Sequence, residues 1–261
     1  MDQVLYRREG AVEVVTLNRP ESKNSFSFNM IKELGDHFQR LTLEDDVRAV
    51  IITGAGKGFC TGADLTGSDN RPDIILPVGM RLSTQWYSRV VAGIMNLEKP
   101  VIGAINGVAA GAGCNLALSC DIIIASEAAS FIQVFVRRGL IADMGGTFFL
   151  PRLIGLARAK ELMFSADEVE ARRALELGMI NKVVPENELM PAAMELAQRL
   201  AHGPTRAIGM IKNMLNRSLE SDLESALERE AAMQGIAVST SDVKEGIVSF
   251  FEKRPPDFSG S

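Results

Sequence analysis

A glycine-rich stretch between two apolar segments constrains the fold of this chain more than any other feature. Residues 106–121 read NGVAAGAGCNLALSCD, and the apolar run at residues 101–105 leads into them. Gly107, Gly111 and Gly113 allow backbone conformations and close approaches that other residues resist. The apolar segment that follows is typical of a helix. The free N–H groups at the start of such a helix favour an anion, or an oxygen that becomes one.

Short apolar runs alternate with helix-like segments through the first half of the chain. Four such runs predict strands, at residues 12–17, 49–53, 101–105 and 122–125. Residues 82–97 predict a long helix, and Ser27 is placed to cap an earlier one. Strands separated by helices imply an α/β core with right-handed crossovers.

The second half of the chain changes to a helical pattern. One apolar stripe has helical spacing: Leu189, Ala193, Leu196, Ala197 and Leu200. Ser221 and Glu224 have capping-box spacing before another helix, and Ser241 is placed to cap the last one. We therefore predict a core over residues 1–200 and a helical oligomerisation region over residues 201–261.

The composition argues against several classes of protein. The chain has 261 residues and a formal net charge of −5, which argues against a nucleic-acid or anionic-membrane surface. No apolar run approaches the length of a membrane span, and the first residues, MDQVLYRREG, lack the apolar core of a secretory signal. Three cysteines without a CxxC pair are typical of reduced thiols. We expect a cytoplasmic protein that binds neither nucleic acid nor membrane.

Several familiar site patterns are absent or weak. Residues 106–113 lack the GxGxxG spacing of a dinucleotide site, and residues 54–58 lack the full phosphate-loop pattern. His37 and His202 are the two histidines, and we expect both to face solvent. A Ser-His-Asp triad or a histidine-rich metal site therefore has little support. The cysteines beside the glycine-rich loops are expected to be small core thiols.

A second glycine-rich segment, KGFCTGADL at residues 57–65, complements the first. Each of the two loops can supply one backbone N–H to a single carbonyl oxygen. Two such donors make an oxyanion hole, and loss of one typically lowers the rate by ~10²–10³. The pair of loops predicts stabilisation of negative charge that develops on a carbonyl oxygen.

Three further segments, together with these loops, carry a family resemblance: LNRPESKNS near the start, GLIADMGGTFFLPRLIG in the middle and GIVSFFEKRPPDF near the end. The chain resembles the crotonase (enoyl-CoA hydratase/isomerase) family over nearly its whole length. The resemblance implies an α/β spiral of ββα units with a helical C-terminal trimerisation region, assembled as a homotrimer or a dimer of trimers. It also implies an acyl-CoA thioester as substrate, and no metal or cofactor apart from the CoA of that substrate.

The resemblance assigns roles to residues of both loops. The oxyanion donors would be the backbone N–H groups of Ala63 and Ala112. Gly111 or Gly113 is the alternative to Ala112 if the register shifts by one. Residues expected to contact the substrate are Lys23, Gly62, Asp64, Leu65, Gly111, Gly113, Asn115, Phe135 and Lys253. Lys253 and Arg254 either pair with CoA phosphates, from a neighbouring subunit in one version, or are solvated surface charges. Residues 66–78 are a candidate cover.

The chain departs from the hydratases of the family at two positions. Hydration of a 2-enoyl thioester requires a water to be deprotonated and the α-carbon to be protonated, and the family's hydratases use two glutamates. Matching the segments puts Asn115 at the first position and Phe135 at the second. Neither side chain exchanges a proton near neutral pH, so an efficient hydratase is disfavoured. A hydratase that works through another acid stays as an alternative.

Asp143, in GLIADMGGT, is the carboxylate that remains near the expected site, as in isomerases of the family. One carboxylate can remove a proton from one carbon and return it to another while the oxyanion hole holds the thioester enolate. A dry pocket raises its pKa and makes it a better base. We therefore expect an isomerase that moves a double bond or isomerises an epoxyphenylacetyl thioester. The alternatives are a helix N-cap role for Asp143 and a non-catalytic binding protein on the same fold.

Two further choices stay open. Asn115 either orients substrate or water, or satisfies buried backbone groups. Five apolar side chains either line the acyl pocket or belong to the core: Met80, Trp86, Phe131, Phe135 and Met144.

Overall fold

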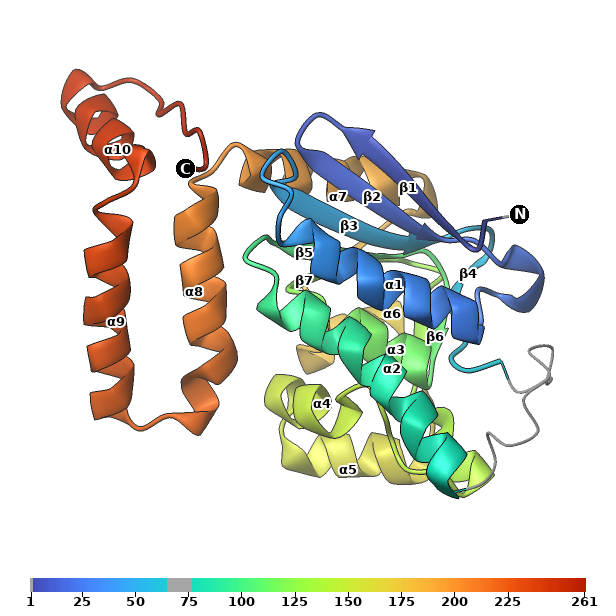
Figure 1. Cartoon of the computed structure of the whole chain (residues 1–261). Coiled ribbons are helices and arrows are strands. Elements are labelled where there is room, and N and C mark those ends of the chain that lie inside the picture. The colour runs from blue at the N-terminus through green and yellow to red at the C-terminus, as the bar shows by residue number, and fades with distance from the viewer. Residues whose placement is uncertain (1, 65–76) are drawn as a thin grey trace.

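The computed structural model describes residues 2–64 and 77–261, and its largest sheet has six strands in the order β1-β2-β3-β5-β7-β10 (Figure 1). These strands are β1 (Val4–Glu9), β2 (Val12–Leu17), β3 (Ala49–Gly54), β5 (Val101–Ile105), β7 (Ile122–Ser126) and β10 (Lys182–Val184). β1 and β2 are antiparallel, and the other neighbouring pairs are parallel. The four strands expected from apolar runs are confirmed, two of them extended by one residue.

A second sheet of short strands lies beside the first, in the order β4-β6-β8-β9. Its strands are β4 (Gly58–Cys60), β6 (Val108–Ala110), β8 (Ser130–Ile132) and β9 (Glu168–Glu170). Each of β4, β6 and β8 follows a strand of the larger sheet directly in the chain, and helices follow β4 and β6. This repeated order confirms the expected ββα units.

Helices cover the larger sheet and continue into the C-terminal region. They are α1 (Phe28–Leu41), α2 (Pro77–Asn96), α3 (Ala112–Leu118), α4 (Gly146–Ile154), α5 (Leu156–Ser165), α6 (Ala171–Leu177), α7 (Leu189–Ala201), α8 (Thr205–Arg217), α9 (Leu223–Ala237) and α10 (Ser241–Glu252). Short 3₁₀ turns are η1 (Pro20–Ser22), η3 (Val134–Arg138), η4 (Glu186–Glu188) and η5 (Ser218–Glu220). Within the two described ranges, no helix combines the length and apolar character that a membrane crossing requires.

Alternate residues of the central strands enter two different cores. On β2, Val15 and Leu17 belong to the core shared with α1 and α2, whereas Val12 and Val14 belong to the core shared with α7. Strands buried on both faces read as continuous apolar runs, which is why these strands stand out in the sequence. In Figure 1, α1 and α2 lie on the near side of the sheet and α7 lies behind it.

The helices α8, α9 and α10 stand beside the ββα core rather than within it (Figure 1). α8 is joined to the core, because Lys212 Nζ lies 2.7 Å from Asp121 Oδ2 and a Cβ at Gly209 would lie 2.6 Å from the Glu98 carbonyl oxygen. α9 and α10 expose large apolar side chains: Leu223, Leu227, Ile236, Ile247, Phe250 and Phe251. The division into residues 1–200 and residues 201–261 stays a prediction.

The helix caps agree with the sequence in one case out of three. The Ser27 side chain accepts a hydrogen bond from the Met30 N–H at 3.1 Å, as predicted for α1. The predicted cap at Ser221 is wrong, because the carboxylate of the next residue, Asp222, accepts from the Ser225 N–H at 2.9 Å. Ser241 is also not a cap. It is the first residue of α10, and its hydroxyl donates to the main-chain oxygen of Ser261 at 2.6 Å.

His37 is buried, contrary to expectation. Its Nε2 lies 2.5 Å from Glu13 Oε1 on β2, and its Nδ1 lies 3.3 Å from an Arg40 nitrogen. Arginine only donates, so Nδ1 accepts and Nε2 carries the hydrogen that Glu13 accepts. Helical spacing placed His37 on α1 but could not show which strand residue faces it. His202 is exposed, as expected.

Candidate active site

The two glycine-rich loops lie next to each other because β4 and β6 are paired. Gly58 is opposite Val108 and Cys60 is opposite Ala109 in this parallel pair, so the segments that leave the two strands are neighbours. A Cβ on Gly113 would lie 2.2 Å from the Cys60 carbonyl oxygen. This spacing leaves no room for a side chain, which explains the glycine.

Gly62 brings the first loop against the start of α3. Its φ of +85° is a left-handed conformation, and a Cβ there would lie 2.9 Å from the Ala110 carbonyl oxygen and 3.2 Å from the Ala112 nitrogen. Ala63 follows directly and forms an isolated parallel bridge with Phe26. The backbone on either side of Ala63 is therefore held in place.

The N–H groups of Ala63 and Ala112 donate to no protein acceptor within the described residues. Gly62 O accepts from the Phe26 N–H at 2.7 Å and the Asp64 N–H donates to Phe26 O at 3.0 Å, so the Ala63 amide between them is fixed but unused. Ala112 is the first residue of α3, where no helical carbonyl can reach its N–H. Gly111 is not an alternative donor, because its N–H donates to Ile132 O at 2.8 Å.

Asp143 lies on the turn that precedes α4. Its Oδ1 is buried and has no hydrogen-bond partner. Burial raises the pKa of the carboxyl to about 6, and its own backbone N–H partly opposes that rise. α4 begins after Gly145 with no side-chain cap, so the N-cap role considered for Asp143 is wrong. The carboxyl is therefore a largely buried acid with one unpartnered oxygen rather than a helix cap.

Asn115 joins α3 to this turn. The side chain is fully buried, and its Nδ2 donates to the main-chain carbonyl of Asp143 at 2.8 Å. Its Oδ1 accepts from Gln133 Nε2 at 2.7 Å. A Cβ on Gly146 would lie 2.4 Å from Asn115 Nδ2, so the turn packs directly on the amide. Of the two alternatives for Asn115, these contacts favour the satisfaction of buried backbone groups.

Gln133 is a polar residue of this region that the sequence did not single out. It follows β8, is 3% exposed, and its Oε1 is buried without a partner. A lone glutamine inside the otherwise apolar run FIQVFV was the available signal.

Phe135 and its neighbour Val134 lie against the loop that carries Gly111. A Cβ on Gly111 would be 3.2 Å from Val134 Cγ1 and 3.8 Å from Phe135 Cζ. Apolar side chains therefore pack beside the residue that precedes Ala112, and apolar surroundings help to exclude water.

The other candidates for the wall of the acyl pocket divide between the core and its edge. Phe131 and Met144 are almost fully buried and belong to the main core cluster. Trp86 is partly buried and packs edge-on against Phe28. The Met80 side chain lies outside the described part of the chain.

The candidate CoA contacts are spread over several elements. Lys23 is exposed, has a left-handed backbone conformation at the end of η1, and lies near Gly58. Asp64 is not a free carboxylate, since Arg19 Nη2 lies 2.8 Å from its Oδ2. Leu65 and residues 66–76 of the candidate cover lie outside the described residues, and the last two positions of that segment already belong to α2.

Lys253 is not brought to the two loops within one chain. It ends α10, which stands far from β4 and α3 in Figure 1. The neighbouring Arg254 is ion-paired, with Glu245 at 2.5 Å and Glu252 at 2.6 Å.

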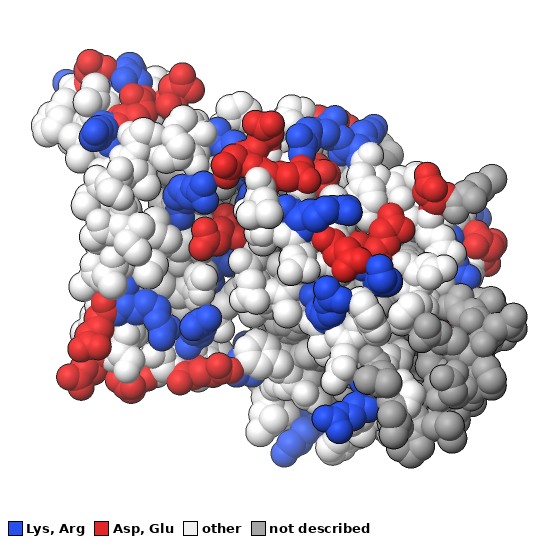
Figure 2. All heavy atoms as spheres, viewed as in Figure 1, with Lys and Arg blue, Asp and Glu red and all other residues white. Residues whose placement is uncertain are grey.

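The face of the molecule shown in Figure 2 carries charges of both signs. Figure 2 shows basic and acidic side chains interspersed over this face, and no stripe of one sign. Among the described residues no cluster of three or more histidine, cysteine, aspartate or glutamate side chains could hold a metal ion.

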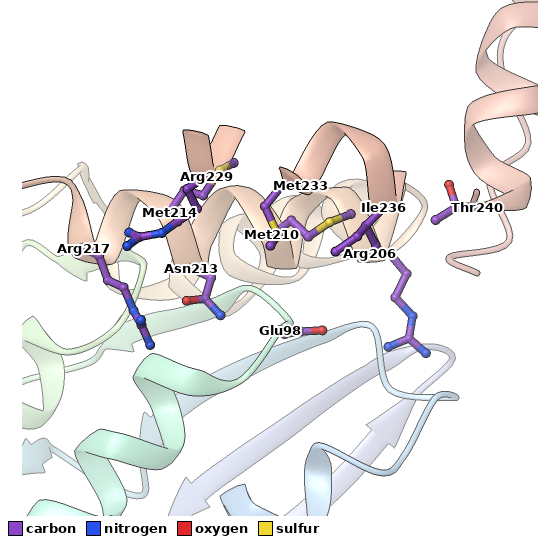
Figure 3. Close-up of a pocket in the computed structure, with 10 residues that line it drawn as sticks. All are labelled: Glu98, Arg206, Met210, Asn213, Met214, Arg217, Arg229, Met233, Ile236 and Thr240. Carbon is purple, nitrogen blue, oxygen red and sulfur yellow. The ribbon is translucent and has the colours of Figure 1, made fainter. Parts of the chain in front are cut away.

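A cavity of ≈ 500 Å³ lies elsewhere, between α8, α9 and the loop before β5 (Figure 3). Met210 of α8 and Met233 of α9 meet across it, and Arg206, Arg217 and Arg229 extend from its walls. It includes neither glycine-rich loop nor Asp143, so we place the candidate active site at the two loops.

The fold and this site match a known family. A family model described as "Enoyl-CoA hydratase/isomerase" matches residues 7–261. The chain is 41% identical over 261 residues to the 1,2-epoxyphenylacetyl-CoA isomerase of Escherichia coli, covering 100% of this chain and 99% of that one. It is 38% identical over 255 residues to the short-chain-enoyl-CoA hydratase of Clostridium acetobutylicum, covering 97% and 96%. The crystal structure of enoyl-CoA hydratase from Bacillus anthracis matches with a TM-score of 0.93 at 34% identity, covering 100% of both chains.

The chain therefore belongs to the enoyl-CoA hydratase/isomerase family and has its crotonase-like α/β fold. The relative named as an isomerase and the relative named as a hydratase have similar identities to this chain, 41% and 38%. The choice between the two reactions therefore depends on the residues of the site.

Proposed function

We propose that the chain is an acyl-CoA isomerase in which Asp143 moves a proton between two carbons of the thioester substrate. The observation that carries the proposal is the Asp143 carboxyl itself. Its Oδ1 atom is buried without a partner, and burial raises the pKa of the carboxyl to about 6. A base with such a pKa is ionised at neutral pH and still basic enough to accept a proton from carbon.

In the proposed reaction the thioester oxygen accepts hydrogen bonds from the N–H groups of Ala63 and Ala112. Asp143 removes a proton from a carbon next to or conjugated with the carbonyl, and the electron pair moves onto the thioester oxygen as an enolate. The two N–H groups stabilise that charge. With a 3-enoyl thioester, the carboxyl then returns the same proton to a different carbon, so the double bond shifts and no atom is gained or lost.

The isomerase is favoured over a 2-enoyl-CoA hydratase because Asn115 and Phe135 stand where the family's hydratases carry glutamates. The NH₂ group and the oxygen of the Asn115 side chain are both hydrogen-bonded to protein. These bonds support a role in holding the turn rather than in holding a water. The hydratase is retained as the second candidate because a relative named as a short-chain-enoyl-CoA hydratase is 38% identical to this chain.

The proposed substrate is an acyl-CoA thioester, and the reaction needs no metal or cofactor because the proton that leaves one carbon returns to another. The 41% identity with a 1,2-epoxyphenylacetyl-CoA isomerase supports an epoxyphenylacetyl thioester as one substrate, and a 3-enoyl thioester is the other. The contact residues proposed from the resemblance keep that role here apart from Asn115, whose side chain is engaged with protein, and Lys253 is supplied by a neighbouring subunit.

We also propose a homotrimer or a dimer of trimers. The exposed apolar side chains of α9 and α10, among them Phe250 and Phe251, support burial against a second copy. The methionine-lined cavity between α8 and α9 lies in the same region (Figure 3).

A product assay with three thioesters separates the candidate functions. The purified protein is incubated with a 3-enoyl-CoA, epoxyphenylacetyl-CoA and crotonyl-CoA, and the products are identified by mass and chromatography. Isomerisation of one of the first two, with slow water addition to crotonyl-CoA, supports the proposal. Water addition at ordinary hydratase rates favours the second candidate, and no turnover of any of the three favours the non-catalytic binding protein.

A further inference from the structure

Two consecutive hydrogen bonds link Gln133, Asn115 and the main-chain carbonyl of Asp143, the residue that carries the proposed catalytic carboxyl. Gln133 donates from Nε2 to Asn115 Oδ1 at 2.7 Å, and Asn115 donates from Nδ2 to the Asp143 carbonyl oxygen at 2.8 Å. Gln133 and Asn115 are 3% and 0% exposed, so water does not compete for these bonds. In a dry interior such bonds are strong, and leaving one unmade is costly.

The Asp143 carbonyl fixes which group donates and which accepts in both of these hydrogen bonds. The Asp143 carbonyl can only accept, so Asn115 must present its NH₂ group to the turn and its oxygen to Gln133. Gln133 in turn must present its NH₂ group to Asn115. An Asn115 amide turned the other way would set its oxygen against the Asp143 carbonyl oxygen.

The turn that receives this hydrogen bond is strained and tightly packed. Met144 has a φ of +45° and Gly145 a φ of +75°, so two successive residues are left-handed. A non-glycine residue in that conformation is strained and persists only when its surroundings hold it. The Asp143 carbonyl also accepts from the Gly146 N–H at 3.0 Å. The Asn115 side chain donates a second hydrogen bond to this carbonyl, from a residue outside the turn.

We propose that Gln133 is a positioning residue: by fixing the orientation of the Asn115 amide, it holds the Asp143 turn in the geometry in which the carboxyl reaches the substrate. The inference rests on the proposed role of Asp143. The Gln133 side chain has no hydrogen bond with Ala63, Ala112 or Asp143 among the described residues, and it acts through Asn115.

The groups that contact the Gln133 amide are uncharged, and the charged side chains on the adjoining elements are exposed. The effect of a carboxyl introduced at position 133 can therefore be interpreted. Its amide contacts the Cys114 thiol of α3, whose pKa burial raises to about 12, and the uncharged Asn115. Arg137 and Arg138 on the adjoining η3 are exposed, and Glu168 and Glu170 on the neighbouring β9 are exposed as well. Among the described residues no charged side chain contributes to the raised pKa of the Asp143 carboxyl.

Two variants of Gln133 test the proposal. Gln133→Leu removes the donor, and we expect kcat for isomerisation to fall ~10–100-fold with KM within ~3-fold, because small misplacements of a catalytic group have effects of this size. Gln133→Glu keeps the shape. Its carboxyl can donate to Asn115 Oδ1 only when protonated, and burial favours that form. The ratio of its kcat to that of the wild type should therefore fall ~10-fold or more between pH 6 and pH 9.

The controls separate positioning from stability and from the role of Asp143. Thr53→Val removes another buried hydrogen bond, from Thr53 Oγ1 to Ala104 O at 2.9 Å, and should lower stability without changing kcat or its pH profile. Asp143→Asn, assayed in parallel, tests the proposed function alone. If Asp143→Asn is inactive while Gln133→Leu keeps wild-type kcat, or if Gln133→Glu shows a pH-independent ratio, the positioning role is wrong and the proposed function stands. If Asp143→Asn keeps full activity, the proposed function fails first.

Discussion

Gly113 of α3 lies so close to Cys60 of β4 that a Cβ on Gly113 would be 2.2 Å from the Cys60 carbonyl oxygen. This contact fixes the separation of the two loops whose amides form the proposed oxyanion hole. The distance between the loops is therefore set by backbone packing rather than by side chains.

Gly113→Ala should disturb the proposed site more than the fold. We expect a loss of about 1–3 kcal/mol in unfolding free energy from overpacking, and a fall in isomerisation of ~10² or more as one donor moves. Urea denaturation and a kcat measurement check both. Gly235→Ala is the matched control, since Gly235 is also helical and has open space around it. Equal behaviour of the two variants would contradict the proposed close contact.

Asp143→Asn should make the protein more stable at alkaline pH. The folded-state pKa of about 6 lies above the ordinary value of 3.8, so ionisation costs the folded state free energy. That cost is absent below about pH 4, grows as pH rises through 6, and reaches at most about 3 kcal/mol. Denaturation midpoints at pH 4 and pH 8 test this. A stability difference between variant and wild type that does not change with pH would show that the carboxyl is not desolvated.

The Lys212–Asp121 pair should anchor α8 to the core. Lys212→Met leaves the Asp121 carboxylate without its cation, and burial already raises the pKa of Asp121. Because the Asp121 side chain is 21% exposed, we expect a loss of about 2–3 kcal/mol, below the range for fully buried pairs. The double variant Lys212→Met/Asp121→Asn should recover most of that loss in a urea titration. An equal loss in the double variant would mean that packing, not charge, holds α8.

The exposed phenylalanines of α10 should be needed for assembly. Light scattering should give the wild type three or six times the chain mass of 28.3 kDa, and a smaller mass for Phe250→Ser/Phe251→Ser. Phe164→Ser is the control, because Phe164 is equally exposed but lies on α5. A monomeric wild type would rule out the proposed assembly.

The sequence predicted the parts of the fold that continuous apolar runs encode. Residues 12–17 and 101–105 are strands buried on both faces, and that burial is visible as an unbroken run. The apolar pattern alone does not predict the second sheet, because β4, β6 and β8 have three residues each, too few for a period to show.

The proposed site was predictable where backbone geometry demands glycine and unpredictable where distant side chains meet. Gly62 and Gly113 stand out in the sequence because close packing excludes a side chain. The links from Gln133 to Asn115 and from His37 to Glu13 join residues 18 and 24 positions apart. No local pattern encodes which of these side chains face each other, so only the fold reveals them.

The most direct test of the account compares Asp143→Asn with the wild type in turnover and in binding. Isomerisation of the 3-enoyl or epoxyphenylacetyl thioester is followed by chromatography, and binding of a saturated acyl-CoA by calorimetry. We predict that kcat falls by ~10²–10⁴, the usual contribution of a general acid–base group, while the dissociation constant of the saturated thioester stays within ~3-fold. Unchanged turnover in the variant would contradict the assignment of Asp143 as the group that moves the proton.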